Sequence, residues 1–322
     1  MRRRTAHAPR VLIQAALVAA TLFARPAHAF VHAVSTAGAP LYWPSSCEAV
    51  TIYLNGFDGL TSDQVAEAVA AAAHAWSPQA VTCPEGANDA GAGHPYFEIV
   101  PSLSAGGPVP GVANDGKNAI IFQSTSDWDG PADGLAYTSH FSDSAGRILD
   151  ADIAINATNP GGEGAVWADL DPGAPPSQHA ITRFDLQTAL THEFGHFLGL
   201  AHTCAGGAGS DEGNDQATVD DQGQPVPACD QTTAANQQAQ QAVMWYAISP
   251  DLTDKRVLAP DDARGVCALY PAAQSPGICT LNLPDDGCGC ATAGGARGAS
   301  VLALVLGAVI GLRRRRRRQI AT

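Results

Sequence analysis

An eleven-residue segment with three histidines constrains the fold and the chemistry of this chain more than any other feature. It runs from His192 to His202 and reads H-E-F-G-H-F-L-G-L-A-H. On a helix, His192 and His196 share one face because they stand four residues apart, so they can bind one metal ion. Glu193 points toward the same side. Gly199 can end the helix with a positive φ, after which the chain can return and present His202.

The number of ligands predicts a catalytic zinc site. Three protein ligands leave a fourth coordination position for water, whereas structural zinc sites have four protein ligands. Glu193 can then accept a proton from the zinc-bound water without being a ligand itself. The alternative interpretation is a buried helix with two hydrogen-bonded histidines, which explains neither Glu193 nor the spacing from Gly199 to His202.

Around these residues the chain resembles the metzincin metalloproteases and, among them, the matrixin-like branch. Residues 243–246, which read V-M-W-Y, are similar to the methionine turn beneath the metal in that family, with Met244 as its methionine. The resemblance covers about residues 40–271. It implies an α/β (α+β) fold, a metzincin-like zincin sandwich. In that fold a mixed, twisted sheet packs against an early helix, a zinc-binding active-site helix and a C-terminal helix.

The resemblance also implies a zinc metalloendopeptidase, a peptide-bond hydrolase that acts on protein or peptide substrates with Glu193 as its general base. Two departures concern the segment after the third histidine. The gap from His202 to Met244 is long and contains an acidic, cysteine-bracketed insertion, and Tyr246 stands where matrixins tend to have proline. Astacins and serralysins place a metal-approaching tyrosine there, so Tyr246 is a candidate catalytic residue. The alternative is that Tyr246 packs beneath the site with its hydroxyl hydrogen-bonded.

Hydrophobic periodicity and capping signals predict the order of the elements. A capping box at Thr61 to Gln64 begins an early helix, Asp185 caps the zinc helix over residues 186–198, and Pro260 begins a closing helix. Strands are expected at residues 50–55, 96–100, 119–123, 135–140 and 149–156. These elements form one domain over residues 30–271, which we expect to be monomeric, followed by a linker over residues 272–290.

The N-terminal residues predict export. A basic start, an apolar region over residues 11–23 and the small residues Ala27-His28-Ala29 are typical of a secretory signal peptide, here residues 1–29. The apolar run is short for the alternative, an uncleaved membrane anchor.

The C-terminal residues, 291–322, resemble a MYXO-CTERM surface-sorting tail. Cys288 and Cys290 precede an apolar run over residues 298–312 and six arginines over residues 313–318. The resemblance implies cleavage by a sorting protease near the cysteines and attachment to the cell surface, the outer membrane, through a lipid. The alternative is a plain transmembrane helix as an anchor, whose arginines remain cytoplasmic. A protein released to the extracellular medium is the third outcome of export.

The charge of the central region excludes nucleic-acid binding. Six basic and all 31 acidic residues fall within residues 30–290, a net charge of −25. Such a surface repels phosphate backbones, and it suits an extracellular domain that can bind Ca²⁺ as a structural ion. Asp127, Asp129 and Asp133 lie in a glycine-containing loop with part of a calcium-loop pattern. His140, Asp143 and Asp150 fall where the resembled matrixins place structural-ion ligands, and the resemblance implies calcium or no ion there.

Eight cysteines, all in the exported region, indicate an oxidising compartment. If Cys288 and Cys290 belong to the sorting signal, six remain, and fifteen pairings are open. Proximity in the sequence favours Cys47–Cys83, Cys204–Cys229 and Cys267–Cys279. The alternative for Cys47 is a thiolate that masks the zinc in a latent form.

Two functions of other classes remain open beside the peptidase. One is a surface adhesion or binding module that keeps the metzincin fold without catalysis, against which the intact Glu193 argues. The other is a calcium-dependent structural surface protein, which the excess of acidic residues suggests.

Overall fold

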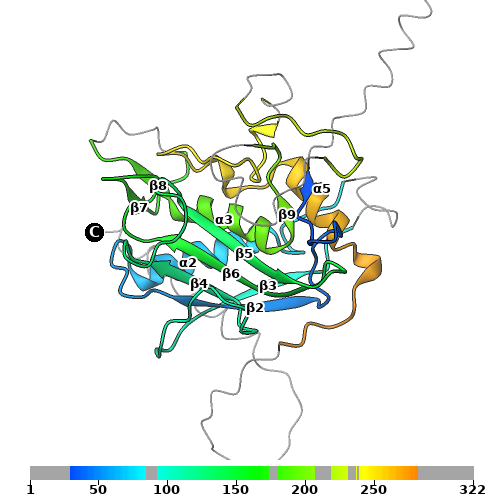
Figure 1. Ribbon diagram of the computed structural model, residues 1–322, viewed down its shortest axis with the longest axis horizontal. Coiled ribbons are helices and arrows are strands. Elements are labelled where there is room, and N and C mark those ends of the chain that lie inside the picture. Colours follow the sequence, from blue (N-terminus) through cyan, green and yellow to red (C-terminus); the bar gives the residue numbers. More distant parts are fainter. Residues whose placement is uncertain are drawn as a thin grey trace, which may run out of the picture. The chain divides into compact units, whose positions relative to one another are not determined.

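A mixed sheet lies at the centre of the fold, with two helices packed on one of its faces (Figure 1). The computed structural model describes residues 30–84, 93–173, 180–206, 219–230, 237 and 239–281. Its five strands follow the order β3-β2-β4-β6-β5. They are β2 (Cys47–Tyr53), β3 (Glu98–Leu103), β4 (Ala119–Gln123), β5 (Ala136–Ser142) and β6 (Ile148–Asn156). The expected mixed α/β architecture is therefore confirmed.

The edge strand β5 runs against the direction of the other four. It pairs antiparallel with β6, with Thr138 opposite Ile153, whereas β3, β2, β4 and β6 are parallel. The side chains of β6 alternate between two buried layers, because Ala151, Ile153 and Ile155 belong to the main hydrophobic core, while Asp150 and Asp152 are buried polar groups. The sheet thus has helices on one face and buried carboxylates on the other.

The helices begin where their capping residues predict. Helix α2 (Ser62–Ala75) follows a complete capping box formed by Thr61 and Gln64, and it buries Val65, Val69 and Ala72. Helix α3 (Leu186–Phe197) follows Asp185, and helix α5 (Pro260–Leu269) has its proline in the first turn. Helices α2 and α3 pack on each other, α2 also against β3 and α3 against β5 (Figure 1).

Two short strand pairs were not predicted. Strand β1 (Val31–His32) pairs antiparallel with β9 (Leu200–Ala201), and β7 (Val166–Ala168) pairs in parallel with β8 (Arg183–Asp185). Strands of two or three residues are too short to show a period in the sequence. Two 3₁₀ turns, η1 (Asp254–Arg256) and η2 (Ala272–Gln274), flank α5.

The buried carboxylates of β6 fasten a surface segment to the sheet. Asp150 Oδ2 accepts hydrogen bonds from the backbone N–H groups of Asp115 and Gly116, each at 2.7 Å. Asp152 accepts from Ala113 and Ala119, each at 3.0 Å. Burial and the charges of Asp150 and Asp115 raise the pKa of Asp152 to about 7.

Among the described residues there are three disulfides, and two of them correct the sequence prediction. The bonds are Cys47–Cys279, Cys83–Cys267 and Cys204–Cys229. The predicted pairs Cys47–Cys83 and Cys267–Cys279 are therefore wrong, whereas Cys204–Cys229 is as predicted. The masking role of Cys47 as a zinc thiolate is also excluded, because its sulfur is bonded to Cys279.

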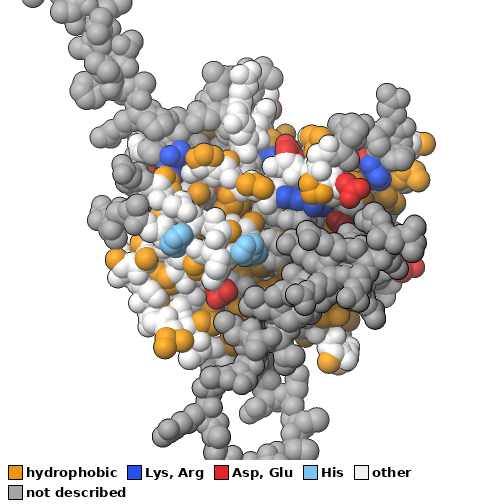
Figure 2. Space-filling model, turned by 180° about the vertical axis from the view of Figure 1, so that it is seen from behind, with side chains coloured by type: hydrophobic (Ala, Val, Ile, Leu, Met, Phe, Trp, Pro, Cys, Tyr) orange, Lys and Arg blue, Asp and Glu red, His pale blue; other side chains and the backbone are white. Residues whose placement is uncertain are grey.

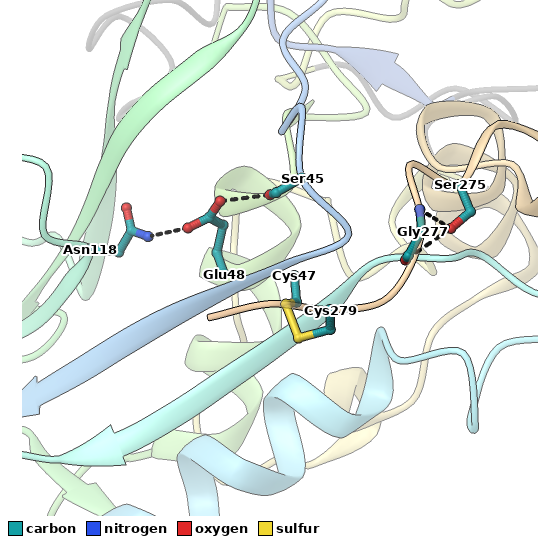
Figure 3. The surroundings of a disulfide bond; sticks show 7 residues. All are labelled: Ser45, Cys47, Glu48, Asn118, Ser275, Gly277 and Cys279. Atoms are coloured by element: carbon teal, nitrogen blue, oxygen red, sulfur yellow. Dashed lines mark hydrogen bonds between the residues drawn. A yellow bond between two sulfur atoms is a disulfide. The ribbon is translucent and has the colours of Figure 1, made fainter. Parts of the chain in front are cut away.

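The physical reason for this error is that folding separates neighbouring cysteines. Cys47 begins β2, and the segment after η2 brings Cys279 beside it, 5.4 Å away between Cα atoms (Figure 3). Cys83 follows α2 and faces the fully buried Cys267 of α5. Because the entropic cost of closing a loop grows only slowly with its length, closeness in the sequence is weak guidance to pairing.

The two ends of the chain lie outside the described residues. These ends hold the expected signal peptide, Cys288 and Cys290, and the arginine-rich tail. Within the described part, no helix combines the length and the apolar character that a membrane span requires.

Candidate metal centre

The start of helix α3 is fixed by a buried carboxylate. Asp185 Oδ2 accepts hydrogen bonds from Thr188, from the backbone N–H at 2.9 Å and from the hydroxyl at 2.7 Å. Arg256 binds the same carboxylate through two nitrogens, at 2.7 Å and 2.5 Å. A bidentate pair of this kind defines both position and orientation, so the first turn of the helix is held against η1.

The end of α3 requires glycine at position 199. Gly199 has φ +97°, and a Cβ atom there would lie 2.4 Å from the carbonyl oxygen of Leu41. The chain then reverses into β9, whose pairing with β1 sets the path toward His202. The predicted role of Gly199 is thus visible in the backbone.

The three histidines come together through their Nε2 atoms. The Nε2–Nε2 distances are 3.2 Å from His192 to His202 and 3.1 Å from His196 to each of the others. Among the described residues, these three histidines form the group of at least three potential metal ligands whose donor atoms lie within 4.8 Å of one another.

The hydrogen bonds of the opposite ring nitrogens show that the group fits a cation. His192 Nδ1 lies 2.7 Å from the carbonyl oxygen of Val243, and His196 Nδ1 lies 2.8 Å from that of Leu200. Because a carbonyl oxygen only accepts, each Nδ1 carries a hydrogen, and in its neutral form each of these two rings directs an Nε2 lone pair toward the other histidines. Lone pairs in this arrangement repel one another unless a metal ion lies among them.

Burial favours the neutral ring that a metal requires. It lowers the pKa of His192 well below its usual value, and the neighbouring His196 and His202 lower it further. A neutral imidazole at ordinary pH is the form that binds a metal.

Glu193 lies beside the three histidines and is held by the edge strand. Its side chain is buried, and Thr138 Oγ1 donates to Glu193 Oε2 at 2.7 Å. Burial raises the pKa of Glu193 to about 7, against the opposing effect of the hydrogen bond from Thr138.

A cavity of about 440 Å³ contains the three histidines and Glu193. One wall is the edge strand and the residues before it, including Leu135, Tyr137 and Thr138, and another contains Phe184 and Ile248. The cavity therefore has polar groups at the metal position and apolar side chains beside it, which is typical of ligand sites. On the described part of the face in Figure 2, charged side chains of both signs lie interspersed with apolar ones.

The turn at residues 243–246, predicted to be a methionine turn, lies directly against helix α3. A Cβ atom at Gly195 would lie 2.1 Å from Met244 Sδ and 2.9 Å from the Trp76 ring, so only glycine fits between them. Met244 is buried, in agreement with a supporting role. The role of Gly195 was not predicted from the sequence, although its position between Phe194 and His196 is part of the motif.

Two buried charged residues hold the backbone of this turn, and neither was predicted from the sequence. Asp262 accepts from the backbone N–H groups of Val243 and Met244, and burial raises its pKa to about 6. Lys255 Nζ donates to the carbonyl oxygens of Gln240 and Ala242. The only signal for Asp262 in the sequence is its place in the first turn of a helix that begins with proline.

Tyr246 lies at the rim of the cavity. Its ring centroid is 6.5 Å from that of His202 and 5.2 Å from that of Trp245, and the side chain is partly exposed. Tyr246 therefore lies beside His202 at one side of the cavity.

The structure does not bring the predicted calcium ligands together. His140 Nε2 contacts the carbonyl oxygen of His196 at 2.6 Å, Asp143 pairs with Arg147 at 2.7 Å, and Asp150 binds backbone N–H groups. In the other group, Asp127 accepts from Ser124, Asp129 from Tyr137, and Asp133 lines the cavity. None of these carboxylates belongs to a converging set of three among the described residues.

Comparison with known proteins supports the metal centre. A search of curated proteins finds no match. A family model described as Peptidase_M43, pregnancy-associated plasma protein-A, matches residues 178–250, a segment that contains Asp185, the three histidines, Glu193 and the turn through Tyr246. The matrixin-like branch and the MYXO-CTERM tail remain predictions. The part of the chain that builds the metal centre is therefore similar to a family of metalloproteases.

Proposed function

We propose that the protein is a zinc-dependent endopeptidase that cleaves protein or peptide substrates. His192, His196 and His202 would hold the ion, and Glu193 would act as the general base. The single observation that carries this proposal is the convergence of the three Nε2 atoms, two of them with Nδ1 bound to a carbonyl, beside a buried carboxylate. The match to a metalloprotease family supports zinc as the metal.

Glu193 and Tyr246 have different proposed roles in the hydrolysis of the peptide bond. Held by His192, His196 and His202, a zinc ion would supply the Lewis acidity that polarises a carbonyl and lowers the pKa of water. Glu193 accepts the proton of the attacking water and transfers it to the leaving amine. Tyr246, at the rim beside His202, is proposed to stabilise the developing oxyanion through its hydroxyl.

The edge strand is proposed to hold the substrate in an extended conformation. One edge of β5 pairs with β6, and residues 134–138 and His140 line the cavity. An extended peptide can add to such an edge by backbone hydrogen bonds, while the apolar side chains of Leu135, Phe184 and Ile248 receive one of its side chains.

Cleavage of a peptide library by the purified full-length chain tests the proposal. We expect cleavage that 1,10-phenanthroline abolishes and zinc restores, and that Glu193→Gln lowers by at least about a thousandfold while zinc remains bound. Glu67→Gln, at an exposed carboxylate of α2, is the control and should retain full activity. Full activity of Glu193→Gln would contradict the mechanism.

Metal analysis and the cleavage assay on the same purified chain distinguish the two other candidate functions. Zinc bound without cleavage of any peptide would favour an adhesion or binding module. Calcium bound without zinc would favour a structural surface protein.

We further propose export and surface attachment from the two ends of the chain. The support is the sequence of residues 1–29, Cys288, Cys290 and the tail over residues 291–322. Cys288→Ala should release the protein to the medium, as measured by fractionation of producing cells. Unchanged retention on the cell surface would count against the sorting tail.

A further inference from the structure

The peptide group that joins Val243 to Met244 lies between His192 and the carboxylate of Asp262. Its carbonyl oxygen accepts from His192 Nδ1 at 2.7 Å, and its N–H group donates to Asp262 Oδ1 at 3.1 Å. His192 Nε2 is the atom that faces the other two ligands. One peptide group and one imidazole ring therefore connect the carboxylate to the metal position.

The carboxylate is placed where it can polarise that peptide group. Asp262 is 1% exposed, and it accepts three backbone hydrogen bonds, from Val243, Met244 and Ala259. A charge held on the N–H side of a peptide group makes its carbonyl oxygen a stronger acceptor, since hydrogen bonds in a chain polarise one another in a low dielectric. A stronger acceptor at Nδ1 increases the basicity of Nε2.

A buried cation, Lys255, binds the preceding peptide group, which joins Ala242 to Val243. Lys255 is 6% exposed, and its Nζ donates to the carbonyl oxygen of Ala242 at 2.7 Å. The N–H of the same peptide group, that of Val243, donates to Asp262 Oδ2 at 2.8 Å. Lys255 and Asp262 thus interact through a peptide group, and this fixes the turn so that the carbonyl of Val243 faces His192.

We propose that Asp262 is a positioning residue that strengthens metal binding by His192 through the Val243–Met244 peptide group. The inference rests on the proposed function, because it assumes that the three histidines bind zinc. Removal of a group that orients a metal-binding histidine typically weakens the affinity 10- to 100-fold. Since Asp262 acts through a peptide group, we expect the lower end of that range, about tenfold.

Competition with a chromophoric zinc chelator measures this effect on the full-length chain. Asp262→Asn should bind zinc about tenfold more weakly than the unsubstituted chain. Asp152→Asn is the matched control, since Asp152 is also 1% exposed and accepts two backbone N–H groups, but on the other face of the sheet. Its zinc affinity should change less than about twofold, although both substitutions should lower the melting temperature of the metal-free protein.

An NMR measurement on the unsubstituted chain tests the inference without relying on a variant that has to fold. Zinc at Nε2 makes His192 Nδ1–H a stronger donor, so zinc addition should shift the Met244 amide proton downfield, because coupling between two sites is reciprocal. The Ala259 amide is the control, since it donates to Asp262 but belongs to a peptide group away from His192. It should move much less than the Met244 amide.

These measurements distinguish a failure of the role proposed for Asp262 from a failure of the proposed peptidase function. Failure of the unsubstituted chain to bind zinc through the histidines would overturn the proposed function. If zinc binds, an unchanged affinity in Asp262→Asn, or equal shifts of the Met244 and Ala259 amides, would overturn the role of Asp262 alone.

Discussion

Thr138 Oγ1 and Glu193 Oε2 are 2.7 Å apart, so the edge strand β5 directly holds the carboxylate next to the metal position. The same hydroxyl lies 3.2 Å from the backbone oxygen of Glu193. The strand proposed to bind the substrate therefore also orients the proposed base, and a shift of either would move the other.

Replacement of Thr138 by valine should lower kcat about tenfold with little change in KM, because valine keeps the shape of the side chain and loses the hydrogen bond to a charged group. Steady-state kinetics on one peptide substrate measures both constants. Thr138→Ser, which keeps the hydroxyl, should recover most of the rate. A rise in KM with constant kcat in Thr138→Val would point to substrate binding instead.

Gly195→Ala should destabilise the protein by about 1–3 kcal/mol, the usual cost of overpacking. The added Cβ meets Met244 Sδ and the Trp76 ring, which are both buried. Urea unfolding measures the loss. Gly111→Ala, where a Cβ meets no atom within 4 Å, should leave the free energy of unfolding nearly unchanged, and equal losses at both positions would contradict the packing argument.

The disulfide next to the third histidine should contribute less to stability than the one between Cys83 and Cys267. Cys204 and Cys229 are 25 residues apart, whereas Cys83 and Cys267 are 184 apart. The intact Cys47–Cys279 bond shortens the path between Cys83 and Cys267 to about 48 residues, 36 to Cys47 and 12 from Cys279. Loop entropy therefore predicts losses of about 3.5 kcal/mol at Cys204–Cys229 and about 4 kcal/mol at Cys83–Cys267 when each pair is changed to serine. Chemical denaturation of the two double variants measures both losses in the free energy of unfolding. A larger loss for the Cys204 and Cys229 variant than for the Cys83 and Cys267 variant would contradict the prediction.

The stability of the protein should fall as the pH rises toward 8, in part because of Asp152. Its folded-state pKa of about 7 lies above the usual carboxyl value of 3.8, so between these limits the folded state binds more protons than the unfolded state. The contribution of Asp152 to stability is present below about pH 4 and is lost as the pH passes through 7.

Denaturation of Asp152→Asn at pH 5 and pH 8 isolates this contribution. An amide does not titrate, so the deficit of the variant relative to the unsubstituted chain should be smaller at pH 8 than at pH 5. A deficit that is equal at both pH values would show that Asp152 is already ionised at pH 5 in the folded protein, so that folding does not raise its pKa.

Local signals in the sequence predict the parts of the site that the helix α3 itself carries. The spacing of His192 and His196, the cap at Asp185 and the positive φ of Gly199 depend on neighbours within a few residues. Thr138 lies 55 residues from Glu193, Lys255 lies 13 or 15 residues from the carbonyl groups it binds, and Asp262 lies 18 or 19 residues from the N–H groups of the turn. No pattern in the sequence specifies such partners. Two disulfide pairings failed for the same reason, since tertiary packing determines which cysteines meet.

The pairing of β1 with β9 has a consequence for when the site can exist. Val31 and His32 align with Ala201 and Leu200, directly before His202, and Tyr270 donates to the carbonyl oxygen of Leu198. A nascent polypeptide that emerges with its N-terminus first cannot complete this geometry until about 240 further residues have followed Val31. Synthesis in one direction thus delays the assembly of the centre until nearly the whole domain has been made.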